Sequence, residues 1–176
     1  MASHDEEFTM LFQEFYPSLC RFLECLLGGR VELAQDLAQE SFLQLHRTAW
    51  ETVPHGEARF WLYRVARNFA INEFRKSHTR YRLFDRVVEV MTPRTRNPEQ
   101  EYETQERKEL VLTILSTLPE DQRVALLLRE HEQLSYKEIG QVLNVSESKV
   151  KVDIFRARAA LRERWTKKEK RVGAAT

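Results

Sequence analysis

Apolar residues recur about every three or four positions along most of the chain, which is the pattern of amphipathic α-helices. The first such stretch covers residues 5–27 and contains Pro17, where we expect a kink or a split. Two more stretches cover residues 31–50 and residues from 57 to beyond 74. Because the joints between the three are short, this part of the chain is predicted to form one compact helical bundle.

The helical periodicity is lost after residue 86, where Pro93 and Pro98 lie among threonine, arginine and asparagine residues. This composition is typical of a linker. The apolar spacing then resumes near residue 105. The sequence therefore predicts an all-α protein of two small helical domains, residues 1–86 and 105–170, joined by a flexible linker over residues 87–104.

The sharpest local pattern lies at residues 134–161, where two apolar stretches flank a short polar break. Ser135 and Glu138 have the spacing of a capping box at the start of the first stretch. Asn144 suits the turn because it tolerates a left-handed backbone, and Ser146 is placed to cap the next helix. The second domain is therefore predicted to carry a helix-turn-helix, whose second helix enters the major groove of DNA.

The second helix of this motif is predicted to have an apolar inner stripe and a basic outer face near its start. Lysine and arginine on such a face reach phosphates or guanine edges, and apolar side chains contact thymine methyl groups. An ordinary helical hairpin with a solvated basic face is the structural alternative. The residues predicted on the outer face are Lys149, Lys151, Val152, Phe155 and Arg156.

The formal net charge is only +1, but the charges are distributed unevenly. Residues 1–57 contain ten acidic residues against three arginines, whereas residues 59–86 contain eight Lys or Arg residues against two acids. Residues 149–171 are basic again, with ten Lys or Arg residues against three acids. Two separate basic blocks indicate two surfaces that face polyanions, although two solvated helix faces would give the same pattern.

Several classes of protein are disfavoured by what the sequence lacks. The acidic N-terminus has no signal-peptide pattern, and no apolar run approaches the roughly 20 residues that cross a bilayer. Cys20 and Cys25 fall in an apolar helical pattern, so we expect buried free thiols rather than a redox or metal pair. The five histidines are scattered, and phosphate-loop, nucleophile-elbow and dinucleotide-binding patterns are missing. We therefore expect a cytoplasmic protein that is not an enzyme and uses no metal or cofactor.

Three segments, in this order, resemble the extracytoplasmic-function (ECF) sigma factors of bacterial RNA polymerase, group IV of the sigma-70 superfamily. Residues 36–50, DLAQESFLQLHRTAW, are similar to their polymerase-binding helix. Residues 60–76, FWLYRVARNFAINEFRK, resemble their promoter-melting and −10-recognition helix. Residues 118–128, LPEDQRVALLL, followed by the helix-turn-helix, resemble their −35-reading domain. The ordered set spans nearly the whole chain.

The resemblance implies a role for each segment, with core RNA polymerase and promoter DNA as partners. The clamp helices of the largest polymerase subunit would contact Asp36, Gln39, Glu40 and Leu43. Unpaired bases of the −10 element would contact a set of aromatic, basic and amide residues, because rings stack on bases and cations bind phosphates: Phe60, Trp61, Tyr63, Arg64, Arg67, Asn68, Asn72, Arg75 and Lys76. The −35 duplex would contact Ser148, Lys149, Lys151, Val152, Phe155 and Arg156.

Three further expectations follow from the resemblance. The loop at residues 51–58 corresponds to the family's pocket for a base turned out of the −10 element. Asp153 lies where relatives commonly carry a basic residue, which puts one phosphate contact in doubt. An anti-sigma factor is expected to cover the polymerase-binding surfaces.

Two other functions fit parts of the sequence. An autonomous helix-turn-helix regulator would bind duplex DNA alone, usually as a two-fold dimer. A sigma-like adaptor would bind polymerase without opening promoters, but the basic and aromatic segment at residues 59–76 argues against it. The sigma-factor interpretation instead predicts that the chain alone binds duplex DNA weakly and that specific initiation occurs only with polymerase.

Overall fold

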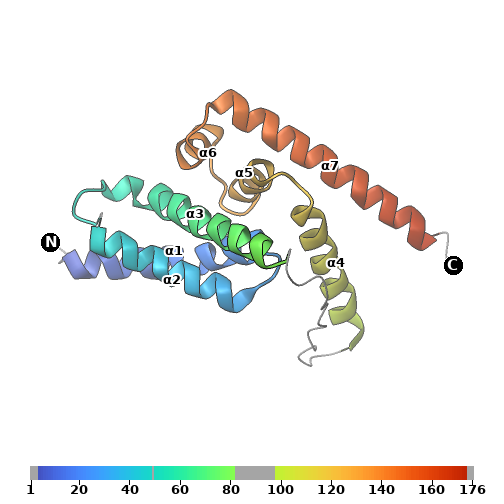
Figure 1. The fold of residues 1–176 in the computed structure, drawn as a ribbon, viewed down its shortest axis with the longest axis horizontal. Coiled ribbons are helices and arrows are strands. Elements are labelled where there is room, and N and C mark those ends of the chain that lie inside the picture. The colour runs from blue at the N-terminus through green and yellow to red at the C-terminus, as the bar shows by residue number, and fades with distance from the viewer. Residues whose placement is uncertain (1–3, 49, 82–97, 174–176) are drawn as a thin grey trace.

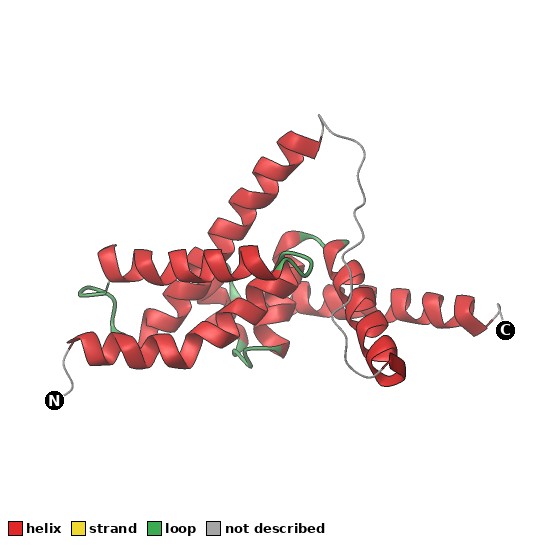
Figure 2. Cartoon of the chain, turned by 90° about the horizontal axis from the view of Figure 1, so that it is seen from below, coloured by secondary structure: helices red, strands yellow, loops and turns green. Residues whose placement is uncertain are grey.

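The computed structural model describes residues 4–48, 50–81 and 98–173, and every regular element within these ranges is an α-helix (Figures 1 and 2). The predicted all-α class is therefore confirmed. None of these helices is long and apolar enough to cross a membrane. The helices are α1 (His4–Leu26), α2 (Val31–Thr48), α3 (His55–Tyr81), α4 (Pro98–Ser116), α5 (Glu120–Glu130), α6 (Tyr136–Leu143) and α7 (Glu147–Gly173).

Helices α1, α2 and α3 lie side by side and form the predicted N-terminal bundle (Figure 1). Phe42 is buried at its centre, and the rings of Phe8 and Phe12 meet it edge-on at centroid distances of 6.2 and 4.8 Å. The expected split at Pro17 is absent, because α1 continues through this residue. Pro17 is exposed on this helix and lacks the N–H that would otherwise bond the carbonyl group one turn earlier.

The predicted linker differs from the structure in one respect. Its residues 87–97 lie outside the described residues, but residues 98–104 belong to the first turns of α4. Pro98 was a linker signal in the sequence, yet it stands at the first position of this helix. Proline is favoured at that position because the N–H that it lacks has no helical partner there.

Helices α6 and α7 form the predicted helix-turn-helix, and its capping interactions are confirmed. The Ser135 hydroxyl accepts a hydrogen bond from the Glu138 backbone N–H at 3.2 Å, and the Glu138 carboxylate accepts one from the Ser135 N–H at 2.6 Å. Asn144 has the left-handed conformation expected of the turn, at φ 55° and ψ 48°. The Ser146 hydroxyl caps α7 by accepting a hydrogen bond from the N–H of Lys149 at 3.2 Å.

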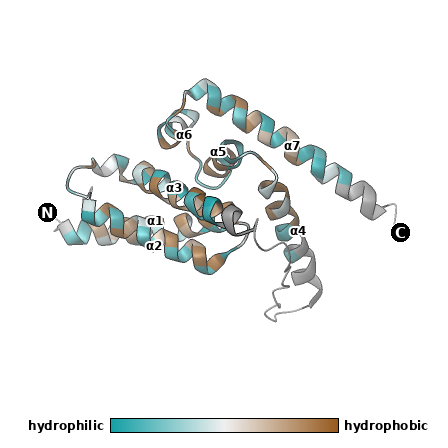
Figure 3. Ribbon diagram, viewed as in Figure 1, coloured by the Kyte–Doolittle hydropathy of each residue, from teal (hydrophilic) through white to brown (hydrophobic). Residues whose placement is uncertain are grey.

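The two domains pack closely against each other, and buried side chains from both form one hydrophobic core. Helix α5 contacts α1, and α6 contacts α3. The C-terminal part of α7 extends away from the other helices, and polar residues dominate its described side chains there (Figures 1 and 3). The described N-terminal bundle and the helix-turn-helix domain therefore contact each other closely, and part of α3 lies at the contact between them.

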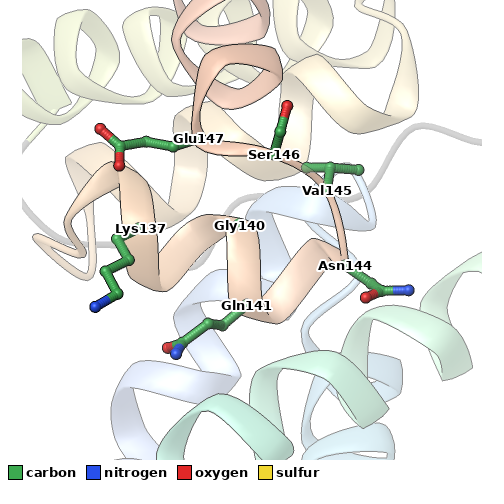
Figure 4. Close-up of a pocket in the computed structure, with 7 residues that line it drawn as sticks. All are labelled: Lys137, Gly140, Gln141, Asn144, Val145, Ser146 and Glu147. Atoms are coloured by element: carbon green, nitrogen blue, oxygen red, sulfur yellow. The ribbon is translucent and has the colours of Figure 1, made fainter.

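Gly140 of α6 lies where the turn passes closest to the helix (Figure 4). A Cβ atom added there would lie 2.8 Å from the backbone carbonyl oxygen of Val145. We predict that Gly140→Ala lowers the free energy of unfolding by about 1–3 kcal/mol, because the backbone must shift to relieve this contact. Urea denaturation followed by circular dichroism measures the change.

Gly56→Ala is the matched control, since an added Cβ at Gly56 would have no neighbouring atom within 4 Å. We expect this variant to keep or slightly exceed the stability of the original chain. Equal stability of the Gly140 and Gly56 variants would contradict the account of the turn.

Candidate nucleic-acid interfaces

The exposed side of α2 is acidic and amide-rich and carries one large apolar residue. Leu43 is 46% exposed, and Asp36, Gln39 and Glu40 are exposed beside it at helical spacing. We call these four residues the α2 face. The opposite stripe of α2, which includes Ala38, is buried in the bundle, so the orientation of the α2 face is fixed by the core.

One side of α3 combines aromatic, basic and amide side chains. Phe60 and Trp61 are half-buried, Arg67 is also partly covered, and the remaining members are exposed. Lys76 lies 2.8 Å from the Glu73 carboxylate. We call this set the α3 face, and it comprises Phe60, Trp61, Arg64, Arg67, Asn68, Asn72, Arg75 and Lys76.

The predicted loop at residues 51–58 is shorter than expected, because α3 begins at His55. Next to it lies a pocket of about 290 Å³, to which Phe60, Trp61 and Arg64 contribute. Gln141 and Asn144 of the helix-turn-helix line the other side of this pocket, and both lie on the side of α6 toward α3 (Figure 4). The second domain therefore closes the space in which the sequence placed a flipped base.

Tyr63 is the one predicted DNA-contacting residue whose position does not fit its predicted role. Its side chain is completely buried, and its ring packs edge-on against Phe22 at a centroid distance of 5.3 Å. Its hydroxyl donates a hydrogen bond to the Glu132 carboxylate and lies 3.0 Å from the Ser18 hydroxyl. Burial raises the pKa of Tyr63, and the hydrogen bond to Glu132 raises it further. In this conformation Tyr63 is therefore buried at the contact between the domains and presents no ring surface to a base.

Two arginines of the α3 face are engaged by the second domain. Arg64 donates a hydrogen bond to the backbone carbonyl oxygen of Gln141 at 2.5 Å. Arg67 lies 2.8 Å from the Glu120 carboxylate and 3.1 Å from that of Asp121, both in the first turn of α5. The Arg67 side chain is only 18% exposed as a result. In this conformation, acids of the second domain occupy cations that the sequence assigned to single-stranded DNA.

Two residues of the second domain, Glu132 and Arg123, bind the bundle at positions away from the α3 face. The backbone carbonyl oxygen of Glu132 accepts a hydrogen bond from Arg59 at 2.7 Å, and its side chain is only 5% exposed. Arg123 donates a hydrogen bond to the carbonyl oxygen of Leu26 at the end of α1 and lies over the Phe74 ring. Burial lowers the pKa of Arg123.

The α7 face consists of Ser148, Lys149, Lys151, Val152, Phe155 and Arg156, all of which are exposed, as the pattern predicts. Phe155 is 69% exposed and Val152 is 45% exposed. The inner residues Val150, Ile154 and Ala157 are buried and hold this face outward. Two exposed apolar side chains among basic residues suit contact with base edges.

Both lysines of the α7 face have intramolecular carboxylate partners. Lys151 lies 2.7 Å from Glu147, and its ammonium group also lies over the Tyr136 ring. Lys149 lies 2.5 Å from Asp153, whose side chain is only 5% exposed. Asp153, whose phosphate contact the resemblance put in doubt, is therefore buried and holds the ammonium group of Lys149. The hydrogen bond to Asp153 raises the pKa of Lys149.

Sequence reasoning missed the residues that join the domains, which are Glu120, Asp121, Arg123, Glu132 and Gln141. Helical periodicity assigns such polar residues to a solvated side, and the motifs that contain some of them indicate no contact with the first domain. The two acids at the start of α5 were the one sequence feature that could have indicated a basic partner for this helix.

Other polar groups in the described part of the chain give no sign of a metal or redox centre. Among the described residues, no group of three or more His, Cys, Asp or Glu side chains is arranged to hold a metal ion. Cys20 and Cys25 are free and half-buried, and burial raises the pKa of both thiols.

The chain is similar to known proteins along most of its length. It matches the family models described as Sigma-70 region 2, over residues 11–80, and Sigma-70, region 4, over residues 108–161. It is 31% identical over 161 residues to the ECF RNA polymerase sigma factor SigM of Bacillus subtilis (strain 168), covering 90% of this chain and 92% of that protein. It is 30% identical to the RNA polymerase sigma factor YlaC of the same organism, covering 93% of this chain and 95% of that protein.

Two solved structures share the fold. The sigma factor RpoE, in its co-crystal with the anti-sigma factor NepR from Bartonella quintana, gives a TM-score of 0.71 at 21% identity. That likeness covers 90% of this chain and 96% of RpoE. CnrH, in complex with the cytosolic domain of CnrY, gives a TM-score of 0.66 at 21% identity and covers 89% of this chain and 85% of CnrH. The arrangement of the helices is therefore one that other chains also adopt.

The pair formed by Lys149 and Asp153 gives a testable prediction about duplex DNA. Asp153→Asn removes the nearer of the two carboxylates beside Lys149, so we expect tighter binding to a random-sequence duplex of about 20 base pairs. The plot of log affinity against log salt concentration should steepen by up to about 0.9, which is the slope of one additional phosphate contact. Fluorescence anisotropy at several salt concentrations measures both quantities.

The control repeats Asp153→Asn in a Lys149→Ala background, where the substitution should have little effect. An equal gain in both backgrounds would contradict the prediction, because the gain would then come from total charge alone.

Proposed function

The chain belongs to the ECF sigma factors, and we propose that its α2, α3 and α7 faces divide the work of promoter-specific transcription initiation. Sigma factors bind core RNA polymerase and promoter DNA and direct initiation. In the proposed division, the α2 face binds polymerase, the α3 face holds unpaired bases of the −10 element, and the α7 face reads the −35 duplex.

The single observation that carries this division is the chemical contrast between the three faces. One chain presents an acidic face with an exposed leucine, a face of arginines with aromatic rings, and a helix-turn-helix face with exposed Phe155. A regulator that binds duplex DNA alone needs the third face but has no use for the second. An adaptor that only binds polymerase needs the first face alone.

The α2 face suits a basic helical partner. The acids Asp36 and Glu40 supply electrostatic complementarity, and Leu43 supplies an apolar anchor that becomes buried on binding. We infer that the clamp helices of the largest polymerase subunit are this partner. The rigid packing of α2 in the bundle presents the face without a change of conformation.

The α3 face suits opened DNA. Phe60 and Trp61 offer rings at one end of the face, and the arginines offer charge along the phosphate backbone. Exposed Asn68 and Asn72 offer amide groups that can bond base edges. The pocket beside Phe60 and Trp61 would receive the base turned out of the −10 element, once Gln141 and Asn144 move away from it.

The α7 face suits the −35 duplex in the major groove. Phe155 and Val152 would contact thymine methyl groups, and Lys149, Lys151 and Arg156 would bind phosphates or guanine edges. Because α7 continues beyond this face as a helix with basic residues such as Arg162, additional phosphate attraction without sequence preference is expected along it.

Regulation by an anti-sigma factor is proposed from the fold. RpoE, whose fold this chain shares, was solved with the anti-sigma factor NepR. We infer that this chain is also held by such a protein, which would compete with polymerase for the α2 face.

Run-off transcription on sheared bacterial genomic DNA tests the proposed function. Core RNA polymerase alone is compared with polymerase plus this protein, and the 5′ ends of the transcripts are mapped. We expect new start sites that share sequences near −10 and −35. Binding to polymerase without new transcripts would favour an adaptor, and dimeric binding to duplex DNA without polymerase would favour an autonomous regulator. Either result would overturn the proposal.

We predict that Leu43→Glu weakens binding to core polymerase by at least about tenfold, since a charge replaces the apolar anchor of the interface. The folded state should keep its stability, because Leu43 is 46% exposed. Affinity for core polymerase is measured with a fluorescently labelled chain. Val111→Glu on α4, where the side chain is 38% exposed, is the control and should bind normally.

We predict that Phe155→Ala changes which promoters are used, with a loss of about 1–3 kcal/mol at sites whose −35 element places a thymine against Phe155. Arg162→Ala is the contrasting variant, because Arg162 should contact phosphates only. It should reduce initiation by a similar factor at all promoters. The same promoter ranking for both variants would contradict the assignment of Phe155 to base reading.

A further inference from the structure

The α2 face is in contact with one residue of α1, Tyr16. The Nε2 group of Gln39 donates a hydrogen bond to the Tyr16 hydroxyl oxygen at 3.4 Å. Gln39 is an exposed member of the α2 face, whereas Tyr16 is half-buried in the bundle. The hydrogen bond therefore ties the amide group of a surface side chain to a residue that packs against the core.

The ring of Tyr16 is held by aromatic packing. It stacks on the ring of Phe12 at a centroid distance of 4.7 Å and an interplanar angle of 18°. It also lies 6.2 Å from the ring of Phe42, which is buried in the bundle. Packing of this kind fixes the plane of the ring, and the hydroxyl oxygen lies in that plane. The acceptor for Gln39 therefore has a defined place at the edge of the α2 face.

The Tyr16 hydroxyl has a second partner on its own helix. A hydrogen bond joins it to the thiol of Cys20, which lies one turn later and is half-buried. Burial raises the pKa of Tyr16, so its hydroxyl keeps its hydrogen at neutral pH. A tyrosine hydroxyl has one hydrogen to donate and lone pairs that accept. It can therefore bind the Cys20 sulfur and accept from Gln39 at the same time.

The hydrogen bond to Tyr16 decides which end of the Gln39 amide is available to a partner. An amide side chain carries two N–H donors on one side and an oxygen acceptor on the other. With the nitrogen turned to Tyr16, the oxygen is the end that remains. Asp36 and Glu40 lie beside Gln39, are exposed, and offer acceptors only when ionised. The three side chains together present acceptors alone, which suits the lysines and arginines of a basic helix.

The opposite orientation of the amide would weaken this surface. It would place the N–H groups of Gln39 against the ammonium or guanidinium groups of a basic partner, so that donors face donors. A side chain that is ordered only on binding also loses rotational freedom at that step, whereas a side chain that is already ordered does not. Tyr16 thus favours binding by fixing the amide before the partner arrives.

We propose that Tyr16 is a positioning residue of the polymerase-binding surface, which turns the oxygen of Gln39 toward basic side chains of the polymerase clamp helices. This inference rests on the proposed function for the identity of the partner. Tyr16 acts through Gln39 and needs no contact of its own with polymerase. The polymerase-binding surface then depends on α1 as well as on α2.

The test compares the affinity of the full-length chain for core RNA polymerase with and without the Tyr16 hydroxyl. Tyr16→Phe keeps the stacked ring and removes only the hydroxyl. We expect this variant to bind about three- to tenfold more weakly, which is the effect of losing one hydrogen bond. In a Gln39→Glu background the same substitution should change the affinity by less than about twofold, because both carboxylate oxygens are acceptors in either orientation.

A Gln39→Ala background gives a second version of the same comparison. It has no amide to orient, so Tyr16→Phe should again have little effect on affinity. Tyr136→Phe on α6 is the matched control, since it removes the hydroxyl of another half-buried tyrosine and should bind polymerase normally. Urea denaturation followed by circular dichroism establishes that each variant is folded.

Two results would overturn the inference. One is a Tyr16→Phe variant that binds core polymerase as tightly as the original chain. The other is an equal loss of affinity in the original, Gln39→Glu and Gln39→Ala backgrounds, because a role confined to packing α1 against α2 would not depend on the side chain at residue 39. Leu43→Glu separates this failure from that of the proposed function. If Leu43→Glu weakens binding and Tyr16→Phe does not, the α2 face still binds polymerase and only the positioning role is wrong.

Discussion

The burial of the Glu132 carboxylate between the two domains is the constraint on which the observed arrangement depends. An ionised carboxylate loses its hydration when it is buried, and only well-placed hydrogen bonds and charges compensate for that loss. Tyr63 and Arg59 provide them, and both extend from α3 of the other domain. Since these partners are available only when the domains are together, the carboxylate links the position of one domain to that of the other. Arg123 adds a second link, because it binds the end of α1 and lies over Phe74.

The consequence of this link is an unequal exposure of the three faces. The α2 face is exposed, and the α7 face is exposed although its two lysines have internal carboxylate partners. The α3 face is partly covered. In the proposed function, one chain reads two promoter elements that lie apart on the DNA. The observed contact instead holds the two domains together, so the proposed function requires them to separate. Separation would also expose apolar side chains that the two domains bury in their common core.

The elements of the fold could be predicted from sequence because they follow from local patterns. Helical spacing identifies the bundle, and the capping residues Ser135, Asn144 and Ser146 identify the helix-turn-helix to the residue. The start of α4 was misplaced, because proline signals both a linker and the first position of a helix.

The α7 face could be predicted because its inner residues are apolar. Tyr63 and Glu132 could not, because their burial depends on where the second domain packs, and periodicity along one helix carries no information about a neighbouring domain. The same reason explains why Asp121 was not recognised as a partner of Arg67.

The measurement that tests this account most directly is the distance between the domains, free and on core RNA polymerase. Fluorescent labels at Gln13 of α1 and Ala159 of α7, which are both exposed, report the distance by energy transfer in a full-length chain whose Cys20 and Cys25 are replaced by serine. The account predicts a short distance in the free chain and a clearly longer one when core polymerase is added before any DNA. An unchanged distance on a polymerase that then initiates at promoters would contradict it, because the α3 face would have acted without being uncovered.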